Sequence, residues 1–205
     1  MLHKKLLNIL SLFMILQSFL FCKKSNCNVE DNSNINFYLG ADLSYVNEME
    51  DCGAVYKNSD NQEADVFDIF EKAGANLIRV RLWHNPTWTN YSNFEDVKKT
   101  IRRAKDNNMS VLLDFHYSDT WADPYKQEIP LAWEINLNND SLLGEMLYDY
   151  TFSTLTTLDS LELSPEIVQI GNEINPMILQ KGNLQWPIDW NRNSLLLNKG
   201  IEAVR

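Results

Sequence analysis

The chain has 205 residues, of which 44% are hydrophobic and 11% aromatic, so it can bury an ordinary core and does not resemble a disordered protein. Its formal net charge of -10 would repel phosphate backbones, and no basic stripe is visible, which argues against a nucleic-acid partner. The 6 Trp and 8 Tyr suit flat, amphipathic ligands such as sugars, although aromatic side chains fill cores equally well.

The N-terminal residues have the pattern of a targeting segment followed by a tether. Lysines precede an apolar stretch that ends at Cys22, which is typical of a bacterial lipoprotein signal over residues 1–22 with Cys22 lipidated. Phe21 departs from the small residue usual before that cysteine, and an uncleaved membrane anchor is the alternative. Either one predicts export, to the periplasm or cell surface as a lipoprotein, or by secretion. Residues 23–36, rich in Asn and Ser, predict a flexible tether.

The cysteine and histidine residues predict neither a disulfide scaffold nor a metal site. Three cysteines are too few for a scaffold, and Cys27 and Cys52 could pair only if the fold brought them together. There is no Cys-x-x-Cys motif, and the 3 His are scattered along the chain.

Four strand–helix units follow the tether, each with a short apolar strand, a polar loop and an amphipathic helix. The strands are predicted over 37–43, 75–83, 110–116 and 166–171, and the helices over 63–73, 94–107, 141–161 and from 189 onward. Strands that alternate with helices predict a parallel sheet with right-handed crossovers.

An open doubly wound sheet and a closed (β/α)8 TIM barrel both satisfy this pattern. The barrel is favoured because polar and aromatic residues gather after all four strand ends, and because the first turn is not rich in glycine. A barrel needs eight units, so we expect residues 37–205 to be the N-terminal half of one.

The second predicted strand places Arg79 and Arg81 on one face, opposite Ile78, Val80 and Leu82. Guanidinium groups cannot point into the apolar helix layer, so both should point into the barrel, where they need carboxylate partners and can hold a catalytic Glu. A purely structural ion pair is the alternative. Arg81 lies nearer the carboxyl end of the strand and is the better candidate for the active site.

The third predicted strand carries Asp114 and His116 on one face and is followed by Asp119. The Asp114–His116 pair could act as a proton relay, or it could orient a sugar. Orientation is preferred because no Ser or Cys stands nearby in the context of a nucleophile. Tryptophans that follow strand ends could stack on pyranose rings or plug the barrel mouth; they are Trp83, Trp121, Trp133 and Trp186.

Glu173 stands at the end of the fourth predicted strand. The apolar run from Ile167 to Ile170 predicts a strand covered on both faces, and Gly171 lets the backbone open into the polar tip Asn172-Glu173. Catalytic groups of such barrels sit at the carboxyl ends of strands, so Glu173 is a catalytic candidate. A solvated loop glutamate, or a glutamate in the first turn of a helix, is the alternative.

In this order, the motifs resemble those of the arabinogalactan endo-β-1,4-galactanases, which are clan A retaining glycoside hydrolases of glycosyl hydrolase family 53. The block from Asp114 to Pro124 is specific to that family, whereas the Asn-Glu pair identifies only the clan. The motifs are Phe37–Ser44, Arg79–Trp83 with Asn85 and Pro86, Asp114–Pro124, Pro130 with Trp133, and Ile170–Asn175 followed by Trp186 and Pro187.

The resemblance implies a hydrolase of β-1,4-galactan or arabinogalactan side chains of pectin. Glu173 would be the proton donor and acid/base, and Asn172 would hydrogen-bond the sugar 2-hydroxyl. The other implied binding residues are His116, Trp121, Asp114, Asp119, Arg81, Trp83 and Trp186, with Arg79 and Asp42 in support. The family nucleophile is a second Glu at the end of strand seven, beyond residue 205, so this fragment alone is expected to be inactive.

The resemblance implies no required cofactor, and the calcium that some members bind is held by later loops. The segment after Asn175 is longer than the family pattern leads one to expect. Another clan A hydrolase, such as a mannanase or cellulase, and an inactive glycan-binding fragment are the alternative functions.

Overall fold

The computed structural model describes residues 37–205. The predicted signal over 1–22 with Cys22, the predicted tether over 23–36 and Cys27 lie outside the described residues, so these assignments stay predictions. None of the helices in 37–205 is both long enough and apolar enough to cross a membrane.

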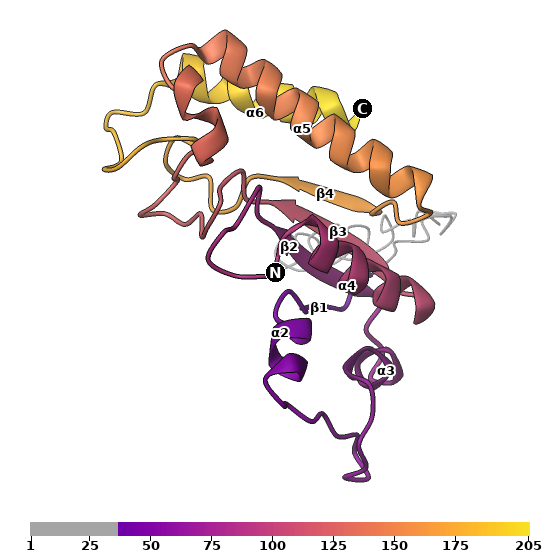
Figure 1. Ribbon diagram of the computed structural model, residues 1–205. Helices are drawn as coiled ribbons and strands as arrows, with labels where there is room; N and C mark the ends of the chain where they lie inside the picture. Colours follow the sequence, from indigo (N-terminus) through magenta and orange to yellow (C-terminus); the bar gives the residue numbers. More distant parts are fainter. Residues whose placement is uncertain (1–36) are drawn as a thin grey trace, which may run out of the picture. The chain divides into compact units, whose positions relative to one another are not determined.

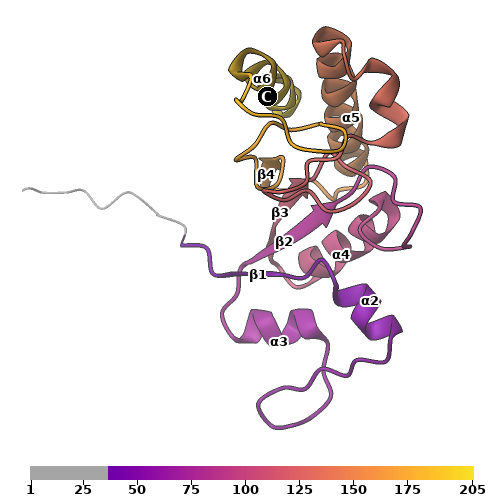
Figure 2. The ribbon, with the colours of Figure 1, turned by 90° about the vertical axis from the view of Figure 1, so that its left-hand side faces the viewer.

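A parallel sheet of four strands organises the described residues (Figure 1). Its strands follow one another across the sheet in chain order, as Figure 2 shows from the side, and the carboxyl ends of neighbouring strands therefore meet at one edge. The strands are β1 (Gly40–Asp42), β2 (Leu77–Leu82), β3 (Ser110–Phe115) and β4 (Ile167–Ile170).

The register of the sheet brings the predicted polar residues side by side. Asp42 of β1 pairs with Arg79 of β2, while Arg81 pairs with Asp114 of β3, which in turn pairs with Gln169 of β4. Because side chains alternate across a strand, the two arginines share one face of β2. The opposite face of β2 is apolar and fully buried, as the alternation predicted.

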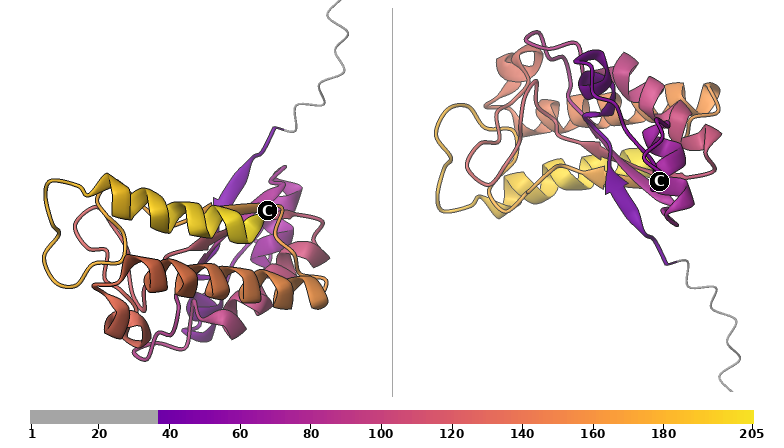
Figure 3. Two further views of the ribbon diagram at one scale, coloured as in Figure 1. Left: turned by 90° about the horizontal axis from the view of Figure 1, so that it is seen from above. Right: turned by 90° about the horizontal axis from the view of Figure 1, so that it is seen from below.

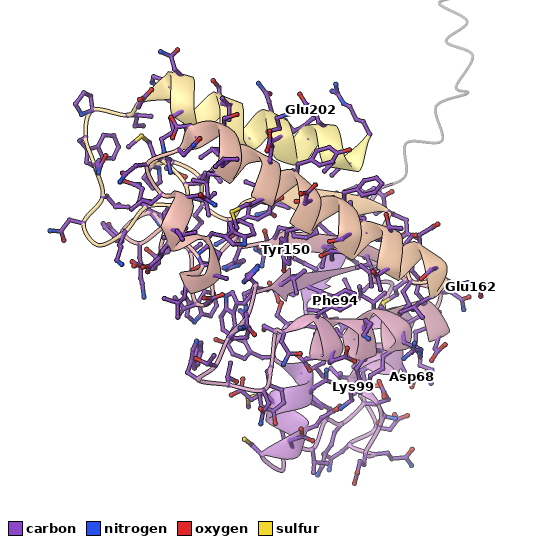
Figure 4. The ribbon with its side chains drawn as sticks, turned by 45° about the horizontal axis from the view of Figure 1, so that its top comes forward. Asp68, Phe94, Lys99, Tyr150, Glu162 and Glu202 are labelled. Atoms are coloured by element: carbon purple, nitrogen blue, oxygen red, sulfur yellow. The ribbon has the colours of Figure 1, made fainter. Side chains whose placement is uncertain are left out.

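The helices pack on the apolar face of the strands and on each other. Helix α4 contacts β2 and β3, whereas α6 contacts β4 and runs beside α5 (Figure 3). The helices are α2 (Val46–Asp51), α3 (Val66–Lys72), α4 (Phe94–Asp106), α5 (Asp140–Ser160) and α6 (Trp190–Val204), with a 3₁₀ helix η1 (Leu131–Asn136). In Figure 4, Tyr150 extends from α5 toward the strand ends.

Local sequence explains α4 well. The side chain of Asn93 caps its first turn by accepting a hydrogen bond from the Asp96 amide, and Val97, Ile101 and Ala104 are fully buried on one face. These are the residues that the periodicity predicted to face inward.

Two short helices and the burial of β4 differ from the sequence predictions. Helices α2 and η1 lie in segments that were predicted as loops. Helix α2 gives no local signal, because it has no side-chain cap and depends on distant partners, such as the bond from Arg103 to Asn47. The strand predicted over 37–43 is shorter, Gly40–Asp42. Strand β4 was predicted to be covered on both faces, which is wrong: all four residues are half-buried, since β4 is an outer strand of this four-stranded sheet.

Candidate active site

A hollow of about 440 Å³ opens where the carboxyl ends of the strands meet. Residues from β1, from β2 and from the loops that follow β1, β3 and β4 form its walls, so four separate parts of the sequence converge there. The lining residues are Asp42, Tyr45, Arg79, Arg81, Trp121, Asn172 and Glu173. The sequence predicted all of these except Tyr45 as site residues.

Glu173 sits on a strained turn at the end of β4. Its φ of 47° lies in the left-handed region, which costs a residue other than glycine about 1–3 kcal/mol. Gly171, at φ 84°, makes the turn feasible, because a Cβ there would lie 2.6 Å from the Ile174 side chain. Gln127 holds the turn by donating from Nε2 to the carbonyl oxygens of Asn172 and Glu173, at 2.9 and 3.2 Å. The turn is therefore braced, and it leaves the Glu173 side chain exposed in the hollow.

Arg79 ties three strand ends together. Its Nη1 donates to Asp42, and its Nη2 donates to Asp114 and, at 2.9 Å, to Oδ1 of Asn172. These contacts match the prediction that Arg79 points into the barrel and pairs with carboxylates. Of the two arginines it is Arg79, and not the favoured Arg81, that contacts a residue of the Asn-Glu tip.

The amide of Asn172 is held in one orientation. Oδ1 accepts from Arg79, and Nδ2 donates to the Ala122 carbonyl at 2.8 Å, so a flipped amide would lose both bonds. The Nδ2 group has a second hydrogen, which can serve a ligand hydroxyl.

Asp42 stays ionised beside Arg79. Burial alone would raise the pKa of Asp42, but hydrogen bonds from the side chain and backbone of Ser44 and from Arg79 outweigh it and hold the pKa below its ordinary value of 3.8. Asp42 therefore presents a fixed negative charge whose two oxygens accept hydrogen bonds from Ser44 and Arg79.

His116 and Asp114 lie behind the wall of the hollow. Both are buried, and Nε2 of His116 lies 3.1 Å from Oδ2 of Asp114. Nδ1 accepts from the Trp83 indole at 3.3 Å and from the Ala122 amide at 3.2 Å, which assigns the ring proton to Nε2, facing Asp114. Neither side chain has exposed surface in the described residues, so direct contact with a sugar is contradicted, whereas a role in orienting the sugar through their neighbours stays a prediction.

The predicted tryptophans divide into exposed and buried ones. Trp121 is 39% exposed and lines the hollow, whereas Trp83 is 1% exposed and Trp133 is also buried. Stacking of a sugar on Trp83 is therefore contradicted, and Trp133 follows the alternative of a core-filling residue. Trp186 is exposed but does not line the hollow, so its contact with a substrate stays a prediction.

Asp119 fastens loops to one another. It accepts from Nδ1 of His84 at 3.2 Å and from the amides of Asn85 and Leu131 at 2.9 Å each. Burial would raise the pKa of Asp119, but these bonds, led by the one from His84, lower it. Direct contact of Asp119 with a substrate stays a prediction.

The partners of Arg81 differ from those predicted. None of the ion pairs in residues 37–205 includes it, and its guanidinium instead packs on the rings of Tyr45, Trp83 and Trp121. The expectation of a carboxylate partner is therefore wrong for Arg81, because aromatic faces replace the carboxylate.

Three residues of the site escaped the sequence analysis. Tyr45 lies three residues after the end of β1 at Asp42, and its position after a strand end was a usable signal. Gln127 braces the Glu173 turn from a distant loop, and Trp88 packs on Trp83 with ring centroids 5.0 Å apart. The sequence around these two residues carries no pattern that points to the site. Within the described residues, no group of three or more His, Cys, Asp or Glu could hold a metal ion.

Comparison with known proteins agrees with the geometry. Residues 38–205 match the model of glycosyl hydrolase family 53. The chain belongs to this family. The resemblance seen in the motifs is thereby confirmed for almost all of the described residues.

Within family 53, this chain is similar to galactanases and to solved structures of the family. It is 54% identical over 183 residues to an arabinogalactan endo-β-1,4-galactanase of Cellvibrio japonicus, covering 88% of this chain and 48% of the relative. It is 37% identical to an endo-β-1,4-galactanase of Bacillus subtilis, covering 85% and 41%. The catalytic domain of a family 53 protein from Ignisphaera aggregans superposes with a TM-score of 0.72 at 32% identity, covering 85% and 49%. A solved structure of fungal β-1,4-galactanases superposes with a TM-score of 0.74 at 35% sequence identity. The match covers 82% of this chain and 48% of the fungal chain.

The chain spans about half the length of the curated relatives it matches. Its four parallel units correspond to part of the (β/α)8 barrel of family 53, so the predicted fold class is confirmed.

Proposed function

We propose that this chain carries the acid/base half of an endo-β-1,4-galactanase that hydrolyses the galactan or arabinogalactan side chains of pectin with retention of configuration. Membership of family 53 and the names of the relatives support the substrate class. The observation that carries the mechanism is the exposed Glu173 on a braced turn beside an oriented Asn172.

In the proposed first step, Glu173 donates its proton to the leaving glycosidic oxygen, and in the second it takes a proton from water. The free hydrogen of the Asn172 amide would bind the sugar 2-hydroxyl, a contact that strengthens in the transition state. Arg79 keeps this amide in place and pairs with both Asp42 and Asp114. Glu173 then presents an exposed carboxyl group to a ligand in the hollow.

A retaining reaction needs a second carboxylate about 5 Å from the first. Within residues 37–205, the only other carboxylate that lines the hollow is Asp42, and Ser44 and Arg79 occupy its oxygens. We therefore assign the nucleophile to a glutamate outside these residues, at the end of a later barrel strand.

A chimera tests this assignment. Residues 38–205 are joined to the part of the Cellvibrio japonicus galactanase that follows its matching region, which completes a barrel. The chimera should release short galactooligosaccharides from linear β-1,4-galactan, with the β-anomer formed first by NMR, and should leave mannan and cellulose intact. Preferential hydrolysis of mannan or cellulose, or inversion at the anomeric carbon, would refute the proposed activity.

The residue assignment has a matched control. Glu173→Gln should lower galactan hydrolysis about 10²- to 10⁴-fold, the usual contribution of a general acid. Glu162→Gln changes a glutamate with a similar φ of 59° at the far end of α5 (Figure 4), and should leave the rate unchanged. Equal effects of the two substitutions would rule out a special role for Glu173.

We also propose that the protein is exported as a lipoprotein, supported by the sequence of residues 1–22 alone. Cells that express the chain should incorporate labelled palmitate into it, and Cys22→Ala should abolish the label. A label that survives Cys22→Ala would show that the anchor is elsewhere.

A further inference from the structure

Arg81 is a buried cation without a carboxylate partner. The residue is only 3% exposed. Its Nη2 donates to Oγ of Ser92 at 3.0 Å, and its Nε has no hydrogen-bond partner. Burial accordingly lowers the pKa of this guanidinium. Burying a charge is costly unless other groups compensate, so the groups around this guanidinium must offset that cost.

The compensation comes from three aromatic rings. The guanidinium carbon of Arg81 lies 4.2 Å from the ring centroid of Trp121, 4.4 Å from that of Trp83 and 4.6 Å from that of Tyr45. A guanidinium is planar and stacks on aromatic faces, so contact with three rings at once restricts their mutual orientation. Trp83 is buried behind the arginine, but Tyr45 and Trp121 are 45% and 39% exposed and line the hollow.

We propose that Arg81 is a positioning residue that fixes Tyr45 and Trp121, the sugar platform, as a rigid stacking surface beside Glu173. The ring centroids of Tyr45 and Trp121 lie 6.2 Å apart and their ring planes are inclined by 42°, so the two rings together form a bent surface. A β-1,4-galactan chain is bent at each link, because its 4-oxygen is axial, whereas cellulose and mannan are linked through an equatorial 4-oxygen and run flatter. That the ligand is β-1,4-galactan rests on the proposed function. The bent sugar platform should then bind the bent galactan chain more tightly than the flatter cellulose or mannan chains.

Arg81→Met keeps the bulk of the side chain but removes the planar charge. Because the buried charge lacks an ion-pair partner, the variant should unfold at the same or a higher urea concentration than the wild-type chain. Its dissociation constant for β-1,4-galactotetraose, measured by calorimetry on the 205-residue chain, should rise about tenfold, and preference over cellotetraose should shrink. A merely structural arginine would instead lower stability and affinity together.

A double-mutant cycle separates positioning from direct contact. If Arg81 acts through Trp121, then Arg81→Met should weaken binding by less than about twofold in a Trp121→Ala background. A full tenfold effect in that background would mean that Arg81 touches the ligand itself, and would overturn the proposal. Lys98→Met is the matched control, because Lys98 lies over the Phe94 ring at 5.0 Å and pairs with Glu95, both within α4 and away from the hollow. It should leave the affinity unchanged.

A spectroscopic measurement judges the platform without any ligand. Trp83 and Trp121 lie edge to face at 5.6 Å, and this arrangement should give a near-ultraviolet circular dichroism signal. Arg81→Met should weaken that signal while the far-ultraviolet spectrum is preserved. An unchanged near-ultraviolet signal would overturn the proposal. Failure of the wild-type chain to bind galactotetraose, with the signal still lost in Arg81→Met, would contradict the proposed substrate and not the platform.

Discussion

At the scale of single residues, the position of Glu173 depends on a side chain far away in sequence. Gln127 donates to the carbonyl oxygens of Asn172 and Glu173 and so stabilises a backbone conformation that a glutamate seldom adopts. A carboxyl group that moves by about 1 Å can lose a large part of its catalytic effect. The proposed chemistry therefore depends on the bracing of the turn as well as on the carboxyl group.

We therefore expect Gln127→Ala to lower the galactanase activity of the chimera at least tenfold, through a fall in kcat, because the turn relaxes. Gln185→Ala is the control, since the Gln185 side chain is exposed and makes no hydrogen bond to the Glu173 turn. Activity assays and urea unfolding of both variants measure the effect. A wild-type kcat in the Gln127→Ala variant would show that the turn at Glu173 keeps its conformation without Gln127.

Protonation of Asp119 at low pH should lower the stability of the folded chain, because its carboxylate joins several loops. Hydrogen bonds lower the pKa of this carboxyl below 3.8 in the folded chain, so its contribution to stability is complete above about pH 4 and is lost as pH falls through the lower, folded value. Asp119→Asn should reduce stability at pH 7 and flatten the decline of stability below pH 4. Urea unfolding between pH 3 and 7 measures both slopes, and parallel slopes would contradict this role.

The residue scale also shows what sequence reasoning can find. Alternation along β2 was enough to place Arg79 and Arg81 on one face, and strand ends were enough to select Asp42, Asn172 and Glu173. The same reasoning could not foresee that Arg81 packs on rings or that His116 is buried. Those facts depend on which loops fold over the strand ends, and loop packing leaves no periodic trace in the sequence.

At the scale of elements, helices with both a cap and an apolar stripe were predicted, and those that depend on tertiary contacts were not. Helix α4 has both signals, whereas α2 is held by Asn47, whose amide donates to Asp96 and Thr100 of α4. Because these partners are about 50 residues away, no local window reveals them. The α2 helix matters for the site, since Tyr45 is the residue immediately before it.

The cap of α4 offers a test of this element. Asn93→Ala removes the acceptor for the Asp96 amide and should cost about 1 kcal/mol of unfolding free energy. Asn93→Asp keeps an acceptor at the helix N-terminus and should retain most of that free energy. Urea unfolding of the two variants decides: equal losses would mean that the cap contributes nothing.

At the scale of the whole molecule, our proposal assigns to the described residues a proton donor, an oriented amide and a stacking surface, but not the second carboxylate that a retaining reaction needs. The described chain should therefore bind β-1,4-galactooligosaccharides and release no product from galactan. Calorimetry and reducing-sugar assays on the purified 205-residue chain measure the two properties. Detectable turnover that survives purification and disappears in Glu173→Gln would show that the second carboxylate is already present in these residues.

The most direct measurement of the central claim compares two substrates in the chimera. A poor leaving group needs the proton of Glu173, whereas a dinitrophenolate leaves without protonation. Glu173→Gln should therefore lower kcat/KM about 10²- to 10⁴-fold on β-1,4-galactan and less than about tenfold on a dinitrophenyl β-galactobioside. Equal losses of kcat/KM on the two substrates would contradict the assignment of Glu173 as the acid/base.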